Sequence, residues 1–412
     1  MLDAVRGGAT LQGARDRALA NLVEPDRRLA YELAAGVLRR RGQLDRMLEL
    51  ATANPRLHNV LRLGAYQLRA LARVPAYAAV STSVELAREV AGEKAARYVN
   101  QALRKLASSG SGEQGAVPSH PQWLLRRWRS HFGADETARL VAWNDSKPIL
   151  TLQPARWSPD RLRARLAEAG YGVREAPMGG GIQVSAAGTA PRSLLPDRLP
   201  GFREGAFIVQ DPAHALVCRY AALPPGTVVY DACAAPGGKA VTLERGGARV
   251  MAGDGRRERV SRLVETARRA GVAIQVAVAD LLAAPFRSAA LAAVLVDAPC
   301  SATGTMARHP DARWRVTERM IARAAARQRD LLAAAAALVR PGGLLVYATC
   351  SLEPEENSDI VTEFLARHAN FTRVPAAGAV PAALLTPAGD FQSLPQRHGM
   401  DGAYAARLGR VR

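Results

Sequence analysis

From about residue 226, the chain alternates short apolar runs with longer amphipathic stretches, and this rhythm limits its fold more than any other feature. Five apolar runs have the length and the Val, Ile and Leu content of buried strands. They are 227–233, 248–254, 274–280, 292–297 and 344–349, with helical patterns at 256–270 and 319–338. Continuous apolar strands separated by helices predict a parallel sheet covered by helices on both faces.

The carboxyl ends of these strands carry reactive and polar side chains. Ligands of such sheets bind beyond the carboxyl ends of the strands. Asp254 follows Gly237 by 17 residues, where an acid commonly binds a ribose. Taken singly, Asp254 and Asp280 are equally well explained as caps or turn residues. Together with the other strand-end residues they predict a nucleoside site; these residues are Asp231, Asp254, Asp280, Asp297 and Cys350.

A turn of small residues follows the first strand directly. Its residues are Cys233, Ala234, Ala235, Pro236, Gly237, Gly238 and Lys239. Paired glycines let the backbone approach a ligand and direct amides toward it from a helix start. The run is neither GxGxxG nor a Walker loop. A purely structural tight turn would also explain the glycines.

The four cysteines, at positions 218, 233, 300 and 350, have no CxxC spacing. This absence argues against a zinc site and against a disulfide scaffold. Cys300 and Cys350 each follow a predicted strand, Cys300 within Asp297-Ala298-Pro299-Cys300. The C5 atom of cytosine accepts a methyl group only after a thiolate adds to C6, and a second group must then remove the C5 proton. Two strand-end thiols therefore favour covalent chemistry on a pyrimidine.

Each of these cysteines also has a structural interpretation. Cys300 could serve as a small apolar filler. For Cys350 this alternative is weaker, because the run 354–357 predicts a helix start whose amides and dipole would favour a thiolate.

The chain carries 56 basic and 37 acidic residues, a formal charge of +19. The excess is spread along the chain, as expected for a protein that touches a polyanion with several domains. A genome rich in arginine codons explains why only four of the basic residues are lysines, but not the surplus over acids. The composition and the lack of a long apolar run predict a folded, cytoplasmic protein without a membrane span.

The first part of the chain reads as helical. Leu29, Leu33, Gly36 and Val37 share one helical face, and further helical patterns cover 61–68, 84–90 and 95–106. We expect a helical domain at 1–107, a linker at 108–117, a small α/β module at 118–204 and the sheet domain at 205–412. Within the module, the sequence predicts a helix at 121–132, a strand at 149–153 and a helix at 159–169 capped by Ser158.

Two parts of the chain resemble known families. Residues 205–412 resemble the catalytic domain of the RNA cytosine-C5 methyltransferases of the Nol/Nop/Sun type, and residues 1–107 resemble a NusB-like RNA-binding domain. The combination is similar to bacterial enzymes that methylate 16S rRNA of the small subunit. The matching segments of the catalytic part are 210–211, 231–239, 297–305, 308–311 and 349–357; those of the helical part are 28–33, 36–39, 61–68 and 99–104.

The resemblance implies a Rossmann-like fold, S-adenosylmethionine as cofactor and roles for individual residues. Residues 233–239 would contact the cofactor, Asp254 would bind its ribose and Asp280 would lie by its adenine. Asp297 would face both the cofactor and the target base. Cys350 would be the nucleophile, and Cys300 would assist proton removal or product release.

Two positions depart from the family pattern. Ala302 stands where the family usually has glycine, and Asp401-Gly402-Ala403-Tyr404 replaces an Asp-Gly-Phe-Phe pattern. The first change is expected to narrow the loop after Cys300. The second is expected to remove one aromatic contact.

The sequence as a whole predicts S-adenosylmethionine-dependent methylation of a cytosine C5 in small-subunit (16S) rRNA, with no metal. Three alternatives stay open: a methyltransferase acting on tRNA, one acting on DNA through Pro299-Cys300, and a non-catalytic NusB-like RNA-binding factor. The sequence does not fix the oligomeric state, for which a monomer is the expectation.

Overall fold

The computed structural model of the chain describes residues 1–50, 54–109, 119–186, 194–376 and 378–411. They form two compact units: Met1–Lys147 with Met306–Val316, and Pro148–Thr305 with Thr317–Arg412. The predicted linker lies, from residue 110 on, outside the described residues. The four predicted domain limits stay a prediction, because the two units group the chain more coarsely.

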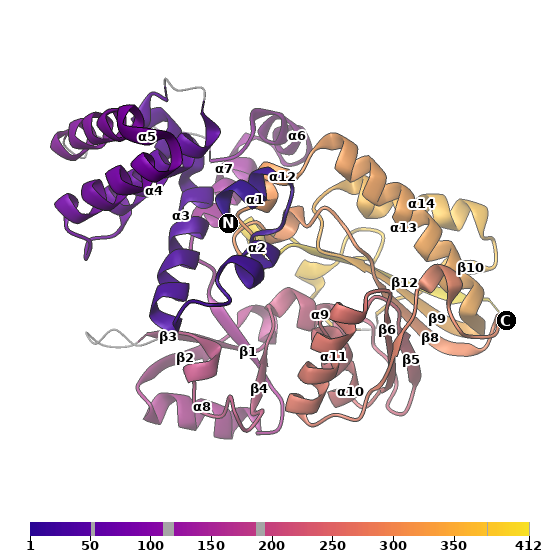
Figure 1. The fold of residues 1–412 in the computed structure, drawn as a ribbon. Coiled ribbons are helices and arrows are strands. Elements are labelled where there is room, and N and C mark those ends of the chain that lie inside the picture. The colour runs from indigo at the N-terminus through magenta and orange to yellow at the C-terminus, as the bar shows by residue number, and fades with distance from the viewer. Residues whose placement is uncertain (51–53, 110–118, 187–193, 377, 412) are drawn as a thin grey trace. The chain divides into compact units, whose positions relative to one another are not determined.

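The first unit is helical (Figure 1). Its helices are α1 Leu2–Arg6, α2 Leu11–Ala18, α3 Glu24–Leu48, α4 Pro55–Ala70, α5 Ala76–Ser108, α6 Gln122–Phe132, α7 Ala134–Asp145 and α12 Ala312–Arg315. Gly92 (φ 79°) breaks α5 into two, as the separate patterns at 84–90 and 95–106 predict. Gly36 lies under the Tyr66 ring, where any side chain would collide with it. Leu29 is 49% exposed, contrary to expectation, because burial in α3 begins only at Ala34.

Residues 306–316 belong to this helical unit although they follow the Cys300 loop in sequence. The side chain of Arg313 is completely buried, with its guanidinium 2.7 Å from Asp145 Oδ1. It also donates to backbone carbonyls, including that of Asn144 (2.8 Å) at the end of α7. Trp314 donates its indole N–H to the Leu38 carbonyl. This segment therefore supplies part of the interior of the helical unit.

The second unit contains a small antiparallel sheet of four strands in the order β2-β3-β1-β4. The strands are β1 Leu150–Pro154, β2 Tyr171–Glu175, β3 Ile182–Ala186 and β4 Phe207–Val209, with α8 Pro159–Glu168 packed against them. Ser158 accepts a hydrogen bond from the Arg161 amide and caps α8, which confirms the prediction. Arg156 donates to the Arg268 and Arg269 carbonyls, so it caps the end of α11 Arg257–Ala270.

The large sheet of the second unit has the order β10-β12-β9-β8-β5-β6-β7, with β11 paired to β12. Its parallel strands are β5 Val228–Asp231, β6 Arg249–Asp254, β7 Gln275–Val278, β8 Leu291–Asp297 and β9 Val339–Thr349. The strand order reverses at β5, whose neighbours are β6 and β8. All five predicted strands are confirmed. The antiparallel strands β10 Phe371–Arg373, β11 Phe391–Ser393 and β12 Ala403–Arg410 were not predicted.

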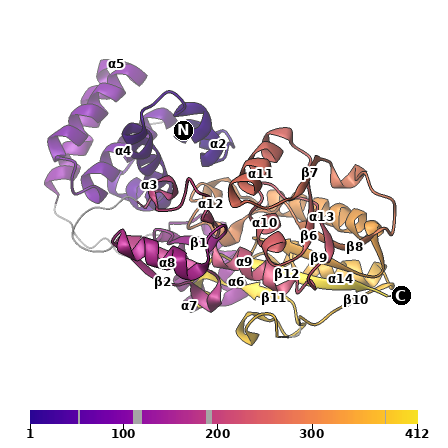
Figure 2. The same ribbon diagram turned by 90° about the horizontal axis from the view of Figure 1, so that it is seen from below.

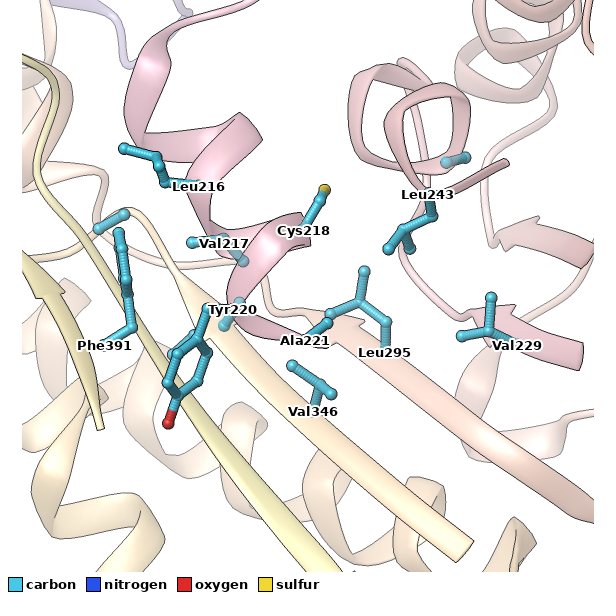
Figure 3. Packing of buried hydrophobic residues seen from close by; sticks show 14 of the residues in the cluster. Leu216, Val217, Cys218, Tyr220, Ala221, Val229, Leu243, Leu295, Val346 and Phe391 are labelled. Atoms are coloured by element: carbon cyan, nitrogen blue, oxygen red, sulfur yellow. The ribbon is translucent and has the colours of Figure 1, made fainter. Parts of the chain in front are cut away.

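Helices cover both faces of this sheet, as Figures 1 and 2 show. One face packs against α9 Pro212–Tyr220, α10 Gly238–Arg245 and α11, and the other against α13 Glu318–Leu338 and α14 Ser358–Arg367. Figure 3 shows the first of these cores, in which Leu216, Tyr220 and Phe391 lie with residues of the strands. Cys218 belongs to this core, so its thiol is a packing group. The architecture is Rossmann-like, as the resemblance implies.

Candidate active site at the carboxyl ends of the parallel strands

The two strand-end cysteines lie side by side. Cys300 follows β8 and Cys350 follows β9, and these neighbouring parallel strands are in register with Asp297 opposite Ala348. The two Sγ atoms are 3.3 Å apart and within hydrogen-bond distance. The Gly304 amide donates to the Cys350 carbonyl at 3.0 Å, which joins the two loops through their backbones. Residues 50 positions apart in sequence thus form one pair of thiols.

The environment of Cys300 favours its protonated form. The hydrogen bond with Cys350 raises the pKa of Cys300 well above its usual range, and burial raises it further. The negative charges of Cys350 and Glu356 act in the same direction. Either sulfur can be the donor in this contact, and the surroundings of Cys300 favour its thiol form.

Lys239, which is buried, and Asp297, which is half-buried, form an ion pair next to the cysteines. Lys239 Nζ lies 2.7 Å from Asp297 Oδ2 and 3.1 Å from His214 Nδ1. Burial lowers the pKa of Lys239, but the charge of Asp297 and its hydrogen bond outweigh burial and raise it. Cys350 also raises it, so the ammonium group interacts with that sulfur. Lys239, which the resemblance places among the cofactor contacts, lies in the protein against Asp297 and His214, and its role toward the cofactor stays a prediction.

The remaining strand-end acids lie along β5, β6 and β7. Asp231 is fully buried, and burial raises its pKa to about 7. Asp254 accepts from the Arg256 amide, and Asp280 from the Leu282 amide. Both therefore make the local caps that their sequence positions allow. Asp254 is buried at the strand end, whereas Asp280 is exposed.

These residues fit S-adenosylmethionine by the chemistry of their donors. Neither carboxylate oxygen of the buried Asp231 has a hydrogen-bond partner among the described residues. The positive charge of Lys239 acts on Asp231 from nearby, and an ammonium or sulfonium group would add a direct partner, which a buried carboxylate needs. Asp254 is an acceptor suited to ribose hydroxyls. Gly237 directly precedes α10 and has φ +106°, and this backbone conformation favours glycine.

Cys233 lies in the same turn, and its thiol is unreactive. Burial raises the pKa of Cys233 to about 12, and nearby acidic groups raise it as well. A thiol with so high a pKa is a poor nucleophile at neutral pH. The surroundings of Cys233 therefore favour the thiol over the thiolate, and its contact with the cofactor stays a prediction.

Two of the matching segments, 210–211 and 308–311, contain an aspartate with structural contacts. Asp211 Oδ1 caps α9 by accepting from the Ala213 amide, and it also accepts from the Asp401 amide at 3.0 Å. Asp311 accepts from the Leu11 amide and pairs with Arg315 inside the helical unit. The predicted helix start at 354–357 is a 3₁₀ turn, Pro354–Glu356, and α14 begins only at Ser358. The expected helix amides behind Cys350 are therefore replaced by a short turn that carries an acid.

Sequence reasoning missed His214, Gln328 and Glu356 as site residues. The helix of His214 was not predicted, and Gln328 lies within a helical pattern where polar residues are common. Glu356 is completely buried in the loop system of the two cysteines. Its one signal in the sequence was its place in the matched segment 349–357.

The departure at Ala302 has a measurable cost. Ala302 adopts φ +58°, in the left-handed region that suits glycine. This conformation costs an alanine about 1 kcal/mol or more relative to glycine. Replacing the alanine by glycine recovers only part of that free energy, because glycine also makes the unfolded chain more flexible. We expect Ala302→Gly to raise the free energy of unfolding by about 0.5–1 kcal/mol in urea titrations. An unchanged or lower value would show that the loop bears no strain at this position.

At the other departure, Tyr404 makes a specific contact. Its hydroxyl donates to Asp390 Oδ2 at 2.6 Å, and Asp390 also pairs with Arg373. Tyr404 is buried in β12 against β9. The aromatic ring is thus retained at position 404, and its hydroxyl is accommodated by an ion pair.

Comparison with known proteins places the whole chain. Residues 4–108 match the NusB family, residues 120–189 a ferredoxin-like domain of RsmF/B-like methyltransferases, and residues 221–409 the family "16S rRNA methyltransferase RsmB/F". The probable ribosomal RNA small subunit methyltransferase B of Synechocystis sp. is 33% identical over 96% of this chain and 94% of its own length. The chain belongs to the ribosomal RNA small subunit methyltransferase B family.

Further relatives agree with this membership. The family member of Pseudomonas putida is 34% identical and covers 98% of this chain and 94% of its own length. The crystal structure of a protein designated PH0851 matches with a TM-score of 0.78 at 25% identity, over 96% of this chain and 94% of that chain. The chain is therefore an RNA methyltransferase that uses S-adenosylmethionine, with a NusB-like helical domain ahead of the catalytic domain.

None of the described helices is long and apolar enough to cross a membrane. Among the same residues, no group of three or more His, Cys, Asp and Glu side chains could hold a metal ion.

Proposed function

We propose that the enzyme methylates C5 of a cytosine in small-subunit rRNA through a covalent bond between Cys350 and C6. The observation that carries this proposal is the contact of 3.3 Å between the Cys300 and Cys350 sulfurs at the ends of two parallel strands. A methyltransferase acting on a ring nitrogen or a ribose needs no thiol, whereas C5 transfer needs a nucleophile and a second group for the proton.

The roles of the two thiols follow from their environments. We assign the proton of the pair to Cys300, whose pKa its surroundings raise, and the nucleophile role to Cys350, with Lys239 placed to stabilise a negative charge on its sulfur. The target base must be unstacked, since stacking hides both of its faces. The Lys239 ammonium group donates a hydrogen bond to Oδ2 of Asp297. We assign the other carboxylate oxygen to the N4 amino group of cytosine, which can donate a hydrogen bond to it and so orient the base, while the negative charge of the addition grows at C5 and N3.

S-adenosylmethionine supplies an electrophilic methyl group. Once Cys350 Sγ is bonded to C6, it no longer carries the negative charge that helps to keep Cys300 protonated. Cys300 can then release its proton to water, and its thiolate, or a water it positions, accepts the proton of C5. Loss of that proton re-forms the C5–C6 double bond and expels the Cys350 thiolate.

The function is tested by labelling. The enzyme is incubated with labelled S-adenosylmethionine and either small-subunit rRNA, tRNA or DNA, and the products are digested to nucleosides. We expect label in 5-methylcytidine from rRNA. Label in another nucleoside, or only in DNA, would overturn the proposal. Calorimetry with S-adenosylmethionine tests the non-catalytic alternative, which predicts no binding.

Replacing Cys300 tests the second half of the mechanism. In Cys300→Ala, addition and methyl transfer remain possible while removal of the C5 proton is slow. We expect an RNA–protein adduct that survives denaturation and is seen as a shifted band on a denaturing gel. The double variant Cys300→Ala/Cys350→Ala is the control and should form none. If the single variant forms no adduct but turns over normally, Cys300 has no part in release.

A further inference from the structure

Each catalytic-site cysteine is followed by a serine, and both serines bind the same carboxylate. Ser301 follows Cys300 and donates its amide to Glu356 Oε1 at 2.8 Å and its hydroxyl to Oε2. Ser351 follows Cys350 and donates its hydroxyl to the same Oε2 at 2.5 Å. One side chain therefore joins the two loops directly behind the two sulfurs.

Glu356 is itself held from both sides. Its carbonyl accepts from the Tyr347 hydroxyl at 2.7 Å, which fixes its backbone to β9. Gln328 of α13 donates to Oε1 at 3.2 Å and to the Pro299 carbonyl at 3.0 Å. Burial raises the pKa of Glu356, while its hydrogen bonds oppose that shift. The described residues give this buried acid only neutral partners at hydrogen-bond distance, so its contacts serve geometry rather than charge neutralisation.

Asn357 continues the same arrangement. Its amide donates to the Ser351 carbonyl at 2.9 Å, and its oxygen accepts from Thr349. The residues on either side of Cys350 are thereby fixed by consecutive residues of one turn. Among the described residues, Asn357 has no such contact with the Cys300 loop. The two loops also meet directly, because the Gly304 amide donates to the Cys350 carbonyl and the Leu352 amide donates to Thr303 Oγ1. Glu356 adds to these contacts a carboxylate that binds the residue following each cysteine.

We infer that Glu356 is a positioning residue that sets the separation of the Cys300 and Cys350 thiols. This inference rests on the proposed function only for its effect on methylation. The two thiols must serve the same base in turn, one bonded to C6 and the other near C5. A carboxylate that accepts from both following serines keeps them in that relation.

The separation of the thiols can be measured without RNA. Diamide oxidises two neighbouring thiols to a disulfide, taking two electrons and two protons as its azo bond becomes a hydrazine. Mass spectrometry of the Cys300–Cys350 peptide pair follows the reaction in the full chain. We expect Glu356→Gln to form this disulfide about ten- to a hundredfold more slowly than the wild type, because small displacements of reacting atoms have effects of this size.

Glu363→Gln is the matched control, since it removes a surface carboxylate that pairs with Arg329 on the neighbouring helix. It should oxidise at the wild-type rate. Ser351→Ala and Ser301→Ala are milder variants that keep the fold, and each should slow disulfide formation. If the serines act through the carboxylate, adding Ser301→Ala or Ser351→Ala to Glu356→Gln should slow disulfide formation no further.

In methylation assays, Glu356→Gln should lower kcat at least tenfold with the KM for S-adenosylmethionine unchanged, as expected of a residue that places the thiols. Wild-type oxidation rates in Glu356→Gln and in both serine variants would overturn the inference. If thiol oxidation slows as expected but no 5-methylcytidine is made even by the wild type, the positioning role stands and the proposed function fails.

Discussion

Cys350→Ala is expected to lower the rate of methyl transfer to RNA by at least about 1,000-fold, with binding of S-adenosylmethionine unchanged. Without a thiolate at C6, C5 has no means of becoming a nucleophile, and the barrier rises by at least about 4 kcal/mol. The rate is measured in single-turnover assays with labelled cofactor and saturating RNA. Cofactor affinity is measured by calorimetry.

Cys218→Ala is the matched control for this experiment. It removes a thiol from the same domain, but one that lies in the core shown in Figure 3. Its turnover should stay within about twofold of the wild type, with a small loss of stability from the cavity. Substantial turnover in Cys350→Ala would remove this residue from the nucleophile role. If Cys300→Ala were then the inactive variant, the order of the two thiols would have to be reversed.

Arg313→Met is expected to lower the free energy of unfolding of the helical unit by about 3–5 kcal/mol, the range for a buried charge network that loses one partner. The change keeps most of the side-chain volume. It leaves Asp145 unpaired, and it leaves buried carbonyls, such as those of Arg39 and Asn144, without their donor. Such unsatisfied groups retain their full desolvation penalty.

Tryptophan fluorescence during urea unfolding measures this effect. Four of the five tryptophans, at positions 123, 128, 143 and 314, belong to the helical unit. Arg88→Met is the control, because Arg88 pairs with Glu93 on an exposed surface. It should leave the transition unchanged. If Arg313→Met unfolds at the same urea concentration as the wild type, the hydrogen bonds of Arg313 make no net contribution to the free energy of unfolding.

The parallel sheet could be predicted from the sequence because its strands are continuously apolar. A strand buried on both faces has no alternative to that pattern. The antiparallel strand β12 was missed, because Ala403–Arg410 mixes small, aromatic and charged residues and owes its place to pairing with β9. Its burial depends on tertiary contacts that no local pattern encodes.

The two cysteines of the candidate site could be predicted because each follows the carboxyl end of a strand and both strands belong to one sheet. That argument brings two side chains to the same edge but gives no distance between them. Glu356 could not be predicted in the same way. Its importance lies in accepting hydrogen bonds from Ser301 and Ser351, and a contact between two loops 55 residues apart leaves no periodic signal. The ion pair of Lys239 with Asp297 was hidden for the same reason, since 58 residues separate the partners.

The place of residues 306–316 has a consequence for biosynthesis. Arg313 reaches its partner Asp145 across 168 residues of chain. A nascent polypeptide therefore emerges from the ribosome with its helical unit incomplete, and the missing piece arrives only after three quarters of the protein has been translated. During that interval the amino-terminal helices lack their central arginine, so a chain stalled before residue 313 would expose an interior that chaperones and proteases recognise.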